Sequence, residues 1–254
     1  MRKIVFSKNL CLAIGALAVG VIAVCCFLGG GGGDLAAAVS GNAKKPIYSV
    51  ATEEKKIAFS FDATWGAEHT EDILNILEEN KVKTTFFLVN IWLDEFPEMA
   101  KLIHDKGHEI QLHSATHPHF PQLTPEAMAG ELQENNAKIK EICGTEGTLF
   151  RPPFGDYDNT VIDTAHGLGL EVIQWSVDSL DWQDITAAEI CERVKKGVTP
   201  GSIILCHNNG LHTAEALAEL LPYFQEQGYT IVPVSELIYG DNYTVDINGV
   251  QSPN

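Results

Sequence analysis

The sequence predicts an α/β protein, a distorted barrel of seven or eight β/α units preceded by a transmembrane helix. Short apolar runs alternate with amphipathic stretches about seven times, which is typical of parallel strand–helix units. No glycine-rich phosphate loop follows the first predicted strand, and this favours a barrel over a doubly wound sheet. A long uncharged apolar stretch near the N-terminus predicts the transmembrane helix.

The N-terminal 28 residues are expected to anchor the chain in a membrane. Three basic residues in segment 1–9 precede the apolar residues 10–28. About 20 apolar residues span a bilayer, and a basic flank stays in the cytoplasm. Residues 1–9 would therefore be a cytoplasmic stub, and the rest would lie outside the cell membrane after a single pass. Cleavage of a signal peptide near Ala36–Ala38 is the alternative, but the apolar run is longer than a usual signal core of about 7–15 residues.

Composition divides the remaining chain into three parts. Five consecutive glycines open segment 29–54, which is expected to be a flexible linker. Residues 55–240 carry the alternating pattern and form the predicted folded domain. The polar segment 241–254 has no periodic pattern and is expected to extend loosely as a tail.

The predicted domain follows a regular order of strands and helices. Thr124 and Pro125 are typical of a helix start, and Gly107, Gly169 and Gly228 each follow a predicted helix. Strands are expected at 57–61, 84–89, 108–112, 148–151, 171–175, 202–206 and 229–232, and helices include 70–80, 124–143, 186–196 and 213–227.

The charge of the chain limits its partners. The formal net charge is −17 at pH 7 over 254 residues. Such a surface repels nucleic acids and anionic lipid headgroups. Neutral polymers such as N-acetylated glycans remain compatible with it.

Ionisable side chains gather at the predicted carboxyl ends of the strands, where the catalytic residues of β/α barrels lie. His113 and His117 are four residues apart, which suits one divalent metal but also an ordinary polar loop. Asp62 could pair with Arg151, which lies in a stiff Pro-Pro turn. The other strand-end residues are Asp178, Asp181, Trp182 and His207.

These segments, in this order, resemble the polysaccharide deacetylase family (carbohydrate esterase family 4, with a NodB-like domain). The resemblance covers residues 55–240, and segment 61–66 together with the N-terminal anchor is similar to its sporulation-associated, PdaB-like branch. It implies hydrolysis of the amide C–N bond of N-acetyl groups on GlcNAc or MurNAc units of cell-wall or spore-cortex glycan. It also implies a divalent metal, usually zinc and in some cases cobalt, held by one Asp and two His.

The resemblance also implies roles for the acid–base residues. Asp62 matches the catalytic base, and Arg151 matches the arginine that orients it. His207 matches the general acid, and Asp181 the carboxylate that tunes this histidine.

Metal and substrate contacts are implied in the same way. His113 and His117 match the two metal-binding histidines. The main-chain N–H of Phe154 matches an oxyanion donor, Trp182 a groove wall, and Leu205 the pocket for the acetyl methyl group.

One position departs from the family pattern, because Ala63 stands where the metal-binding Asp is expected. A methyl group cannot bind a metal, so its affinity should fall. Metal could still bind through the two histidines and water, Asp62 could turn inward as a ligand, or the site could hold no metal.

Two main hypotheses about function follow from this departure. The first is a metal-assisted N-deacetylase of extracellular glycan. The second is a weakened or inactive glycan-binding protein, in which Trp65 and Trp182 supply stacking surfaces. A hydrolase of another amide with different or no metal ligands is a third, weaker interpretation.

Overall fold

A computed structural model of the protein describes residues 43–254. The predicted cytoplasmic stub, the anchor at 10–28 and most of the glycine-rich segment lie outside the described residues. Within residues 43–254, no helix is both long enough and apolar enough to cross a membrane.

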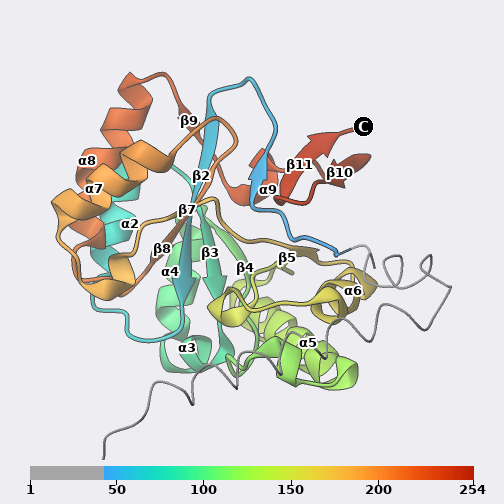
Figure 1. The fold of residues 1–254 in the computed structure, drawn as a ribbon. Helices are drawn as coiled ribbons and strands as arrows, with labels where there is room; N and C mark the ends of the chain where they lie inside the picture. The colour runs from blue at the N-terminus through green and yellow to red at the C-terminus, as the bar shows by residue number, and fades with distance from the viewer. Residues whose placement is uncertain (1–42) are drawn as a thin grey trace, which may run out of the picture. The chain divides into compact units, whose positions relative to one another are not determined.

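The main sheet is parallel and follows the strand order β6-β5-β4-β3-β2-β8-β7, with β9 paired to β2 (Figure 1). Its end strands β6 and β7 are not neighbours in this order, so the barrel is open between them in the described part of the chain. The strands are β2 (Lys56–Ala63), β3 (Thr85–Leu88), β4 (Glu109–Leu112), β5 (Leu149–Phe150), β6 (Glu171–Val172), β7 (Val177–Asp178), β8 (Ile203–His207) and β9 (Thr230–Ile231).

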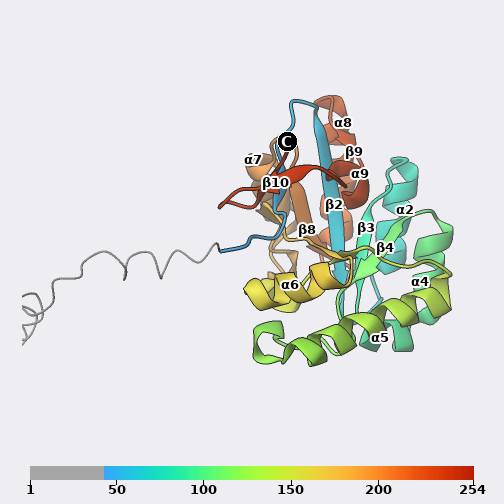
Figure 2. The ribbon, with the colours of Figure 1, turned by 90° about the vertical axis from the view of Figure 1, so that its right-hand side faces the viewer.

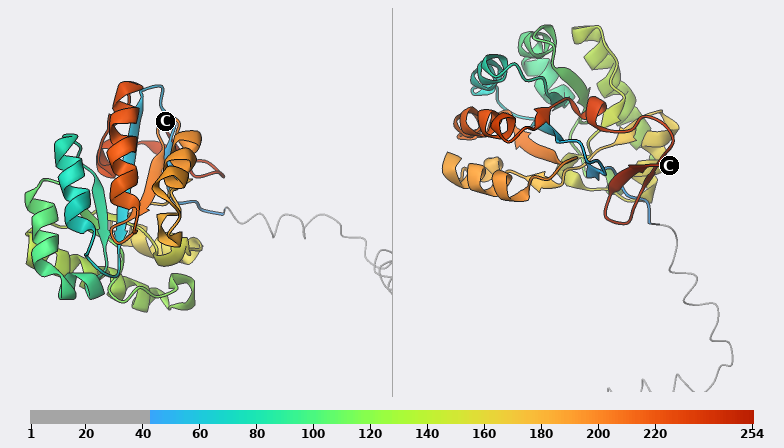
Figure 3. Two further views of the ribbon diagram at one scale, coloured as in Figure 1. Left: turned by 90° about the vertical axis from the view of Figure 1, so that its left-hand side faces the viewer. Right: turned by 90° about the horizontal axis from the view of Figure 1, so that it is seen from above.

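Helices surround the convex side of this sheet (Figures 1 and 2). Helices α2, α7 and α8 lie together on one side, and α3 to α6 continue the layer around the other (Figure 3). The helices are α2 (Thr70–Glu79), α3 (Asn90–Glu95), α4 (Pro97–Asp105), α5 (Pro125–Cys143), α6 (Asn159–Gly167), α7 (Ala187–Gly197), α8 (Thr213–Glu226) and α9 (Val234–Leu237).

Strand β2 shows how the sequence divides the two faces of the sheet. Successive side chains of a strand point to opposite faces. Phe59, Phe61 and Ala63 are fully buried in the apolar cluster that includes residues of the surrounding helices. Ser60 and Asp62 instead contact Arg151. The alternation therefore places the Asp62 carboxylate on the inner face of the barrel, while its apolar neighbours pack against the helical layer.

The segments at the two ends of the described chain differ from the prediction. Residues 44–54 were expected in the linker and 241–254 in a loose tail. They instead form a small sheet of order β1-β11-β10, built from β1 (Ser49–Val50), β10 (Tyr243–Val245) and β11 (Val250–Pro253). Both predictions were wrong because β10 and β11 form a hairpin on which the distant strand β1 pairs, and main-chain pairing of this kind is not visible in the local sequence.

Most predicted strands match observed ones within a few residues. The prediction at 171–175 is too long, because β6 ends at Val172 and a separate strand, β7, begins at Val177. Strand β7 pairs with β8, so Asp178 ends, and Asp181 follows, a different strand from the one predicted. Strand β6 pairs with β5 whereas β7 pairs with β8, and the local sequence does not show this change of partner.

Candidate active site

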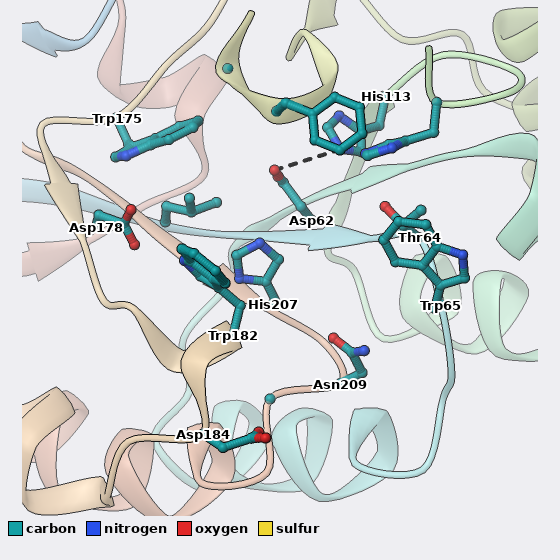
Figure 4. A pocket seen from close by; sticks show the side chains of 15 residues that line it. Asp62, Thr64, Trp65, His113, Trp175, Asp178, Trp182, Asp184, His207 and Asn209 are labelled. Atoms are coloured by element: carbon teal, nitrogen blue, oxygen red, sulfur yellow. Dashed lines mark ion pairs between the residues drawn. The ribbon is translucent and has the colours of Figure 1, made fainter. Parts of the chain in front are cut away.

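A pocket of about 600 Å³ lies at the carboxyl ends of β2, β4, β7 and β8. In Figure 4, Asp62 and His207 lie in its centre, with Trp175, Asp178 and Trp182 on one side and Thr64 and Trp65 on the other. Eight of the ten site residues selected from the sequence line it, and the other two, Arg151 and Asp181, are buried. The eight are Asp62, Trp65, His113, His117, Phe154, Trp182, Leu205 and His207.

The Asp62 carboxylate is held by a buried arginine. Arg151 Nη1 donates to Asp62 Oδ1 at 2.8 Å, and Arg151 Nη2 donates to Ser60 Oγ at 2.9 Å. The guanidinium carbon lies 4.1 Å from the centroid of the Phe87 ring. Burial alone would raise the pKa of the Asp62 carboxyl group, but the charge of Arg151 and then those of nearby imidazoles outweigh burial and lower it below 3.8. Asp62 is therefore ionised and fixed at neutral pH.

His207 is held in the same way by Asp181. Asp181 Oδ1 accepts a hydrogen bond from His207 Nδ1 at 2.8 Å, and Oδ2 accepts from the main-chain N–H of His207 at 2.7 Å. Thr213 Oγ1, at the start of α8, donates to the same Oδ2 at 2.7 Å. Burial by itself would lower the pKa of His207, but the hydrogen bond and charge of Asp181 outweigh burial and raise it above 6.5. The imidazole can therefore carry a proton near neutral pH.

His113 is buried beside the Asp62 carboxylate. Its Nδ1 lies 2.8 Å from the carbonyl oxygen of Arg151. A carbonyl only accepts hydrogen bonds, so Nδ1 carries the proton and Nε2 is free. Nε2 lies 3.7 Å from Asp62 Oδ2. Burial, the largest effect, lowers the pKa of His113. The imidazole is therefore neutral and points a nitrogen lone pair toward the carboxylate.

His117 lies between aromatic side chains at the pocket edge. Its ring centroid is 5.0 Å from that of His113, 5.2 Å from Trp65 and 4.5 Å from Phe154. Burial is the largest cause that lowers the pKa of His117, to about 4. Both histidines predicted to bind a metal are thus neutral near pH 7 and share one wall of the pocket.

Helix α5 holds the loop that carries these histidines. Glu131 Oε2 accepts hydrogen bonds from the main-chain N–H groups of Ala115 and Thr116 at 3.0 and 2.7 Å. Asn135, one helical turn later, accepts from the His113 N–H at 2.9 Å through Oδ1. Neither residue is among the candidate site residues predicted from the sequence. Their spacing of four on one helix was the available signal, but it does not show which loop the helix contacts.

Backbone strain concentrates around the pocket. A positive φ is unfavourable for residues other than glycine and often marks functional sites. Within residues 43–254, five of the seven non-glycine residues with positive φ lie in the loops around this pocket, and they are Ser114, His117, Phe154, Leu180 and Asp184. The turn at Phe154 is further fixed by Gln174, whose Nε2 donates to the Gly155 carbonyl at 3.1 Å.

The donors present do not fit the expected three-ligand metal site. His113 and His117 line the pocket, but Oδ1 of Asp62 accepts a hydrogen bond from Arg151 and so already has a partner. Ala63 is fully buried in the apolar cluster and is not among the pocket-lining residues. In the described part of the chain, no group of three His, Cys, Asp or Glu side chains is placed to hold a metal ion.

Comparison with known proteins agrees with this geometry. Residues 49–173 match the profile of the family described as polysaccharide deacetylase. The chain is 32% identical over 196 residues to a peptidoglycan-N-acetylglucosamine deacetylase of Bacillus cereus, a match that covers 75% of this chain and 92% of that protein. The chain belongs to the polysaccharide deacetylase family.

Two further relatives show how varied this family is. The chain is 34% identical to the uncharacterized protein YlxY of Bacillus subtilis, covering 76% of this chain but only 60% of YlxY. It is also similar to the crystal structure of BA3943 from Bacillus anthracis, with 32% identity, a TM-score of 0.74, and coverage of 82% of this chain and 73% of that one. BA3943 is described as a pseudoenzyme of carbohydrate esterase family 4, and a mutant of it as having restored enzymatic activity.

Proposed function

We propose that this protein binds N-acetylated glycan of the peptidoglycan class and hydrolyses the amide of its N-acetyl groups. The observation that carries the proposal is that a carboxylate and an imidazole, Asp62 and His207, line the same pocket. Asp62 is kept ionised by Arg151, and Asp181 raises the pKa of His207 so that the imidazole can carry a proton. A base and an acid whose pKa values are moved apart are the pair that amide hydrolysis requires.

In the first step, Asp62 takes a proton from a water molecule as the water oxygen bonds to the acetyl carbonyl carbon. Arg151 holds the carboxylate in place, and Oδ2 is the oxygen that Arg151 leaves free. The main-chain N–H of Phe154, on a residue with a φ of 61°, is the proposed donor to the oxyanion.

In the second step, His207 gives its proton to the sugar nitrogen as the C–N bond breaks. The products are acetate and a free amine. Loss of the proton leaves His207 neutral, with its Nδ1–H still bonded to Asp181. Leu205, 3% exposed in the pocket floor, is the proposed contact of the acetyl methyl group, and Trp182 that of the sugar ring.

No step is assigned to a divalent metal. Deacetylases of this family generally use one, and zinc, or cobalt in its place, was the expectation from the resemblance. Because Ala63 supplies no ligand, the acid and base described above carry the proposal.

A second candidate function is glycan binding without hydrolysis. The buried methyl group of Ala63 in place of a carboxylate favours it, as does similarity to the pseudoenzyme BA3943. Under this hypothesis the pocket and its aromatic rim would recognise the same glycan, and the rate of acetate release would be near zero.

One experiment separates the two candidates. Acetate release by the full-length protein is measured on purified peptidoglycan and on N-acetylglucosamine oligomers, with chelator, zinc or cobalt. For a hydrolase, His207→Ala should lower the rate by about 10²–10⁴-fold. His212→Ala is the matched control, since His212 pairs with Glu215 on α8 and does not line the pocket. Saturable glycan binding with no acetate under any metal condition would instead support the binding protein.

We also propose where the protein acts in the cell and in which process. Segment 10–28 supports a single-pass anchor that places the domain outside the cell membrane, where cell-wall glycan is accessible. Similarity of segment 61–66 to the PdaB-like branch supports a role in sporulation. Fractionation of cells with a protease-accessibility assay on intact protoplasts tests the orientation.

A further inference from the structure

Two hydrogen-bond acceptors face each other in the pocket, one on Asp62 and one on His113 (Figure 4). Asp62 Oδ2 lies 3.7 Å from His113 Nε2, which is longer than a hydrogen bond. The other atoms of both groups already have partners. Asp62 Oδ1 accepts from Arg151 Nη1 at 2.8 Å, and His113 Nδ1 donates to the Arg151 carbonyl at 2.8 Å. Each side chain therefore keeps one acceptor atom that meets no donor among the described residues.

Both side chains are buried and yet line the pocket. Asp62 is 7% exposed and His113 is 2% exposed. A buried acceptor without a donor is unfavourable, and more so when it carries a charge. A ligand that brings a hydrogen-bond donor into the pocket would satisfy both atoms, so this pair of acceptors is a candidate binding site.

The charges around the two acceptors favour a cationic ligand. Asp178 and Asp184 line the pocket together with Asp62, whereas no Lys or Arg among the described residues does. Arg151, the partner of Asp62, is fully buried. Three carboxylates thus line the pocket against one imidazole, His207, whose raised pKa lets it carry a proton. The formal net charge of −17 attracts cations to the protein as well.

A primary ammonium group fits these atoms better than a divalent metal does. A metal needs a third protein ligand, which Ala63 does not supply. An ammonium group carries one positive charge and three N–H donors. Hydrogen bonds from a charged N–H to a carboxylate are about 2.7–2.9 Å long, so one nitrogen can reach both Asp62 Oδ2 and His113 Nε2.

We infer that the pocket binds the free amine of a de-N-acetylated amino sugar, held as an ammonium group between Asp62 and His113. Hydrolysis of an N-acetyl group leaves such an amine on the same sugar, so the ligand is the product of the proposed reaction. An active enzyme would retain the glycan that it has deacetylated. A protein without hydrolytic activity would bind glycan that another N-deacetylase has already processed. This inference rests on the proposed function for the class of glycan, but not on hydrolysis by this protein.

Calorimetric titration of the full-length protein in detergent tests the inference. The ligands are the glucosamine trimer and the N-acetylglucosamine trimer, with chelator present throughout so that no metal competes for the two acceptors. The glucosamine trimer should bind about tenfold tighter or more, because hydrogen bonds between charged groups are among the stronger ones. Added salt should reduce this preference, since it screens the charges.

Three variants test where the amine binds. Asp62→Asn removes the charge of one acceptor and should abolish the preference for the glucosamine trimer. Asp178→Asn should lower the preference by about two- to fivefold. Glu98→Gln changes the net charge by the same amount on an exposed residue of α4 that does not line the pocket, so it is the matched control and should keep the preference. If Asp62→Asn does not fold because Arg151 loses its partner, the comparison of Asp178→Asn with Glu98→Gln decides.

The outcomes separate this inference from the proposed function. Equal affinity of the wild type for the two trimers, or tighter binding of the acetylated one, overturns the inference even if acetate is released. A preference that Asp62→Asn and Asp178→Asn retain as fully as Glu98→Gln also overturns it, because general surface charge then attracts the amine. A preference that is lost in the pocket variants alone supports it, even if the protein releases no acetate. If the wild type neither binds a trimer nor releases acetate, both proposals fail.

Discussion

Asp62 and His207 are register partners on neighbouring parallel strands, β2 and β8. Adjacent strands lie about 4.8 Å apart, so main-chain pairing alone places the proposed base beside the proposed acid. Each is then fixed by an opposite charge from elsewhere, Asp62 by Arg151 and His207 by Asp181. The backbone thus sets the separation of the two groups, and the buried partners set their protonation.

Asp181→Asn should lower the pKa of His207, because the charge that outweighs burial is removed. In the wild type, the raised pKa of His207 in the folded state stabilises the fold. This stabilisation is fully present below the ordinary histidine pKa of about 6.5, and it is lost as the pH rises through the folded-state pKa. In the variant, the alkaline limb of the rate profile should move to lower pH. An NMR titration of the His207 ring measures the shift directly. Asp178 makes a smaller contribution to the pKa of His207, so Asp178→Asn should lower that pKa less. An equal shift in both variants would contradict the assignment.

Arg151→Met should strongly destabilise the fold. It leaves the buried Asp62 carboxylate without its partner, and breaking a buried ion pair costs about 3–5 kcal/mol. Chemical denaturation measures the free energy of unfolding. The double variant Arg151→Met, Asp62→Leu should recover part of the loss, because no charge is then left unpaired. Lys101→Met, which breaks an exposed pair with Asp105, serves as control and should change little. If the double variant is less stable than Arg151→Met, the unpaired charge of Asp62 is not the cause of the destabilisation.

Glu131→Gln should loosen the loop that carries His113 and His117. Both main-chain N–H groups donate to the same oxygen of Glu131, and the amide oxygen of Gln can still accept from them, but it carries no charge, so these hydrogen bonds become weaker. Hydrogen bonds to charged groups contribute about 1.5–3 kcal/mol, so amide exchange at these positions should accelerate by about tenfold or more. Glu134→Gln, on the exposed side of the same helix, is the matched control. Unchanged exchange in Glu131→Gln would mean that other contacts hold the loop.

Ala63→Asp should make the stability of the protein dependent on zinc. Position 63 ends β2 between the pocket-lining residues Asp62 and Thr64 but is itself buried among apolar side chains. A carboxylate there is costly unless it turns to the pocket edge, where a cation shared with the two histidines compensates for its charge. The variant should melt at a lower temperature than the wild type in chelator and recover in zinc, because a metal that binds only the folded state stabilises it. The wild type should respond less. Ala58→Asp, on the opposite face of the same strand, should be destabilised without recovery. A zinc response of the wild type as large as that of Ala63→Asp would show that the existing donors already suffice.

The alternation of apolar and amphipathic segments was enough to predict the parallel β/α order. Long strands such as β2 and capped helices such as α5 carry their own pattern, since each buries one defined face. The sequence did not predict four short strands. Strands β1 and β7 pair with segments far along the chain, and β10 pairs with β11 in a hairpin, so pairing and not local alternation makes them strands.

The strand-end positions of Asp62, His113, His117 and His207 were likewise visible in the sequence, because a parallel sheet brings its carboxyl ends to one rim. The partners that control those groups were only partly visible. These partners act through one to three side-chain hydrogen bonds each, and such contacts leave no periodic signal in the chain. They are Glu131, Asn135, Gln174 and Thr213.

The sequence by itself determined the fold class, the family and the residue types at the rim, because these depend on periodicity and on the order of motifs. The tertiary structure decided which groups meet. It placed Asp62 against Arg151 and His207 against Asp181, directed Ala63 into the apolar layer, and aligned Trp65 with His117 and Phe154. Protonation, metal fit and ligand shape depend on distances of a few ångströms between segments far apart in the chain, and these distances exist only once the barrel has formed.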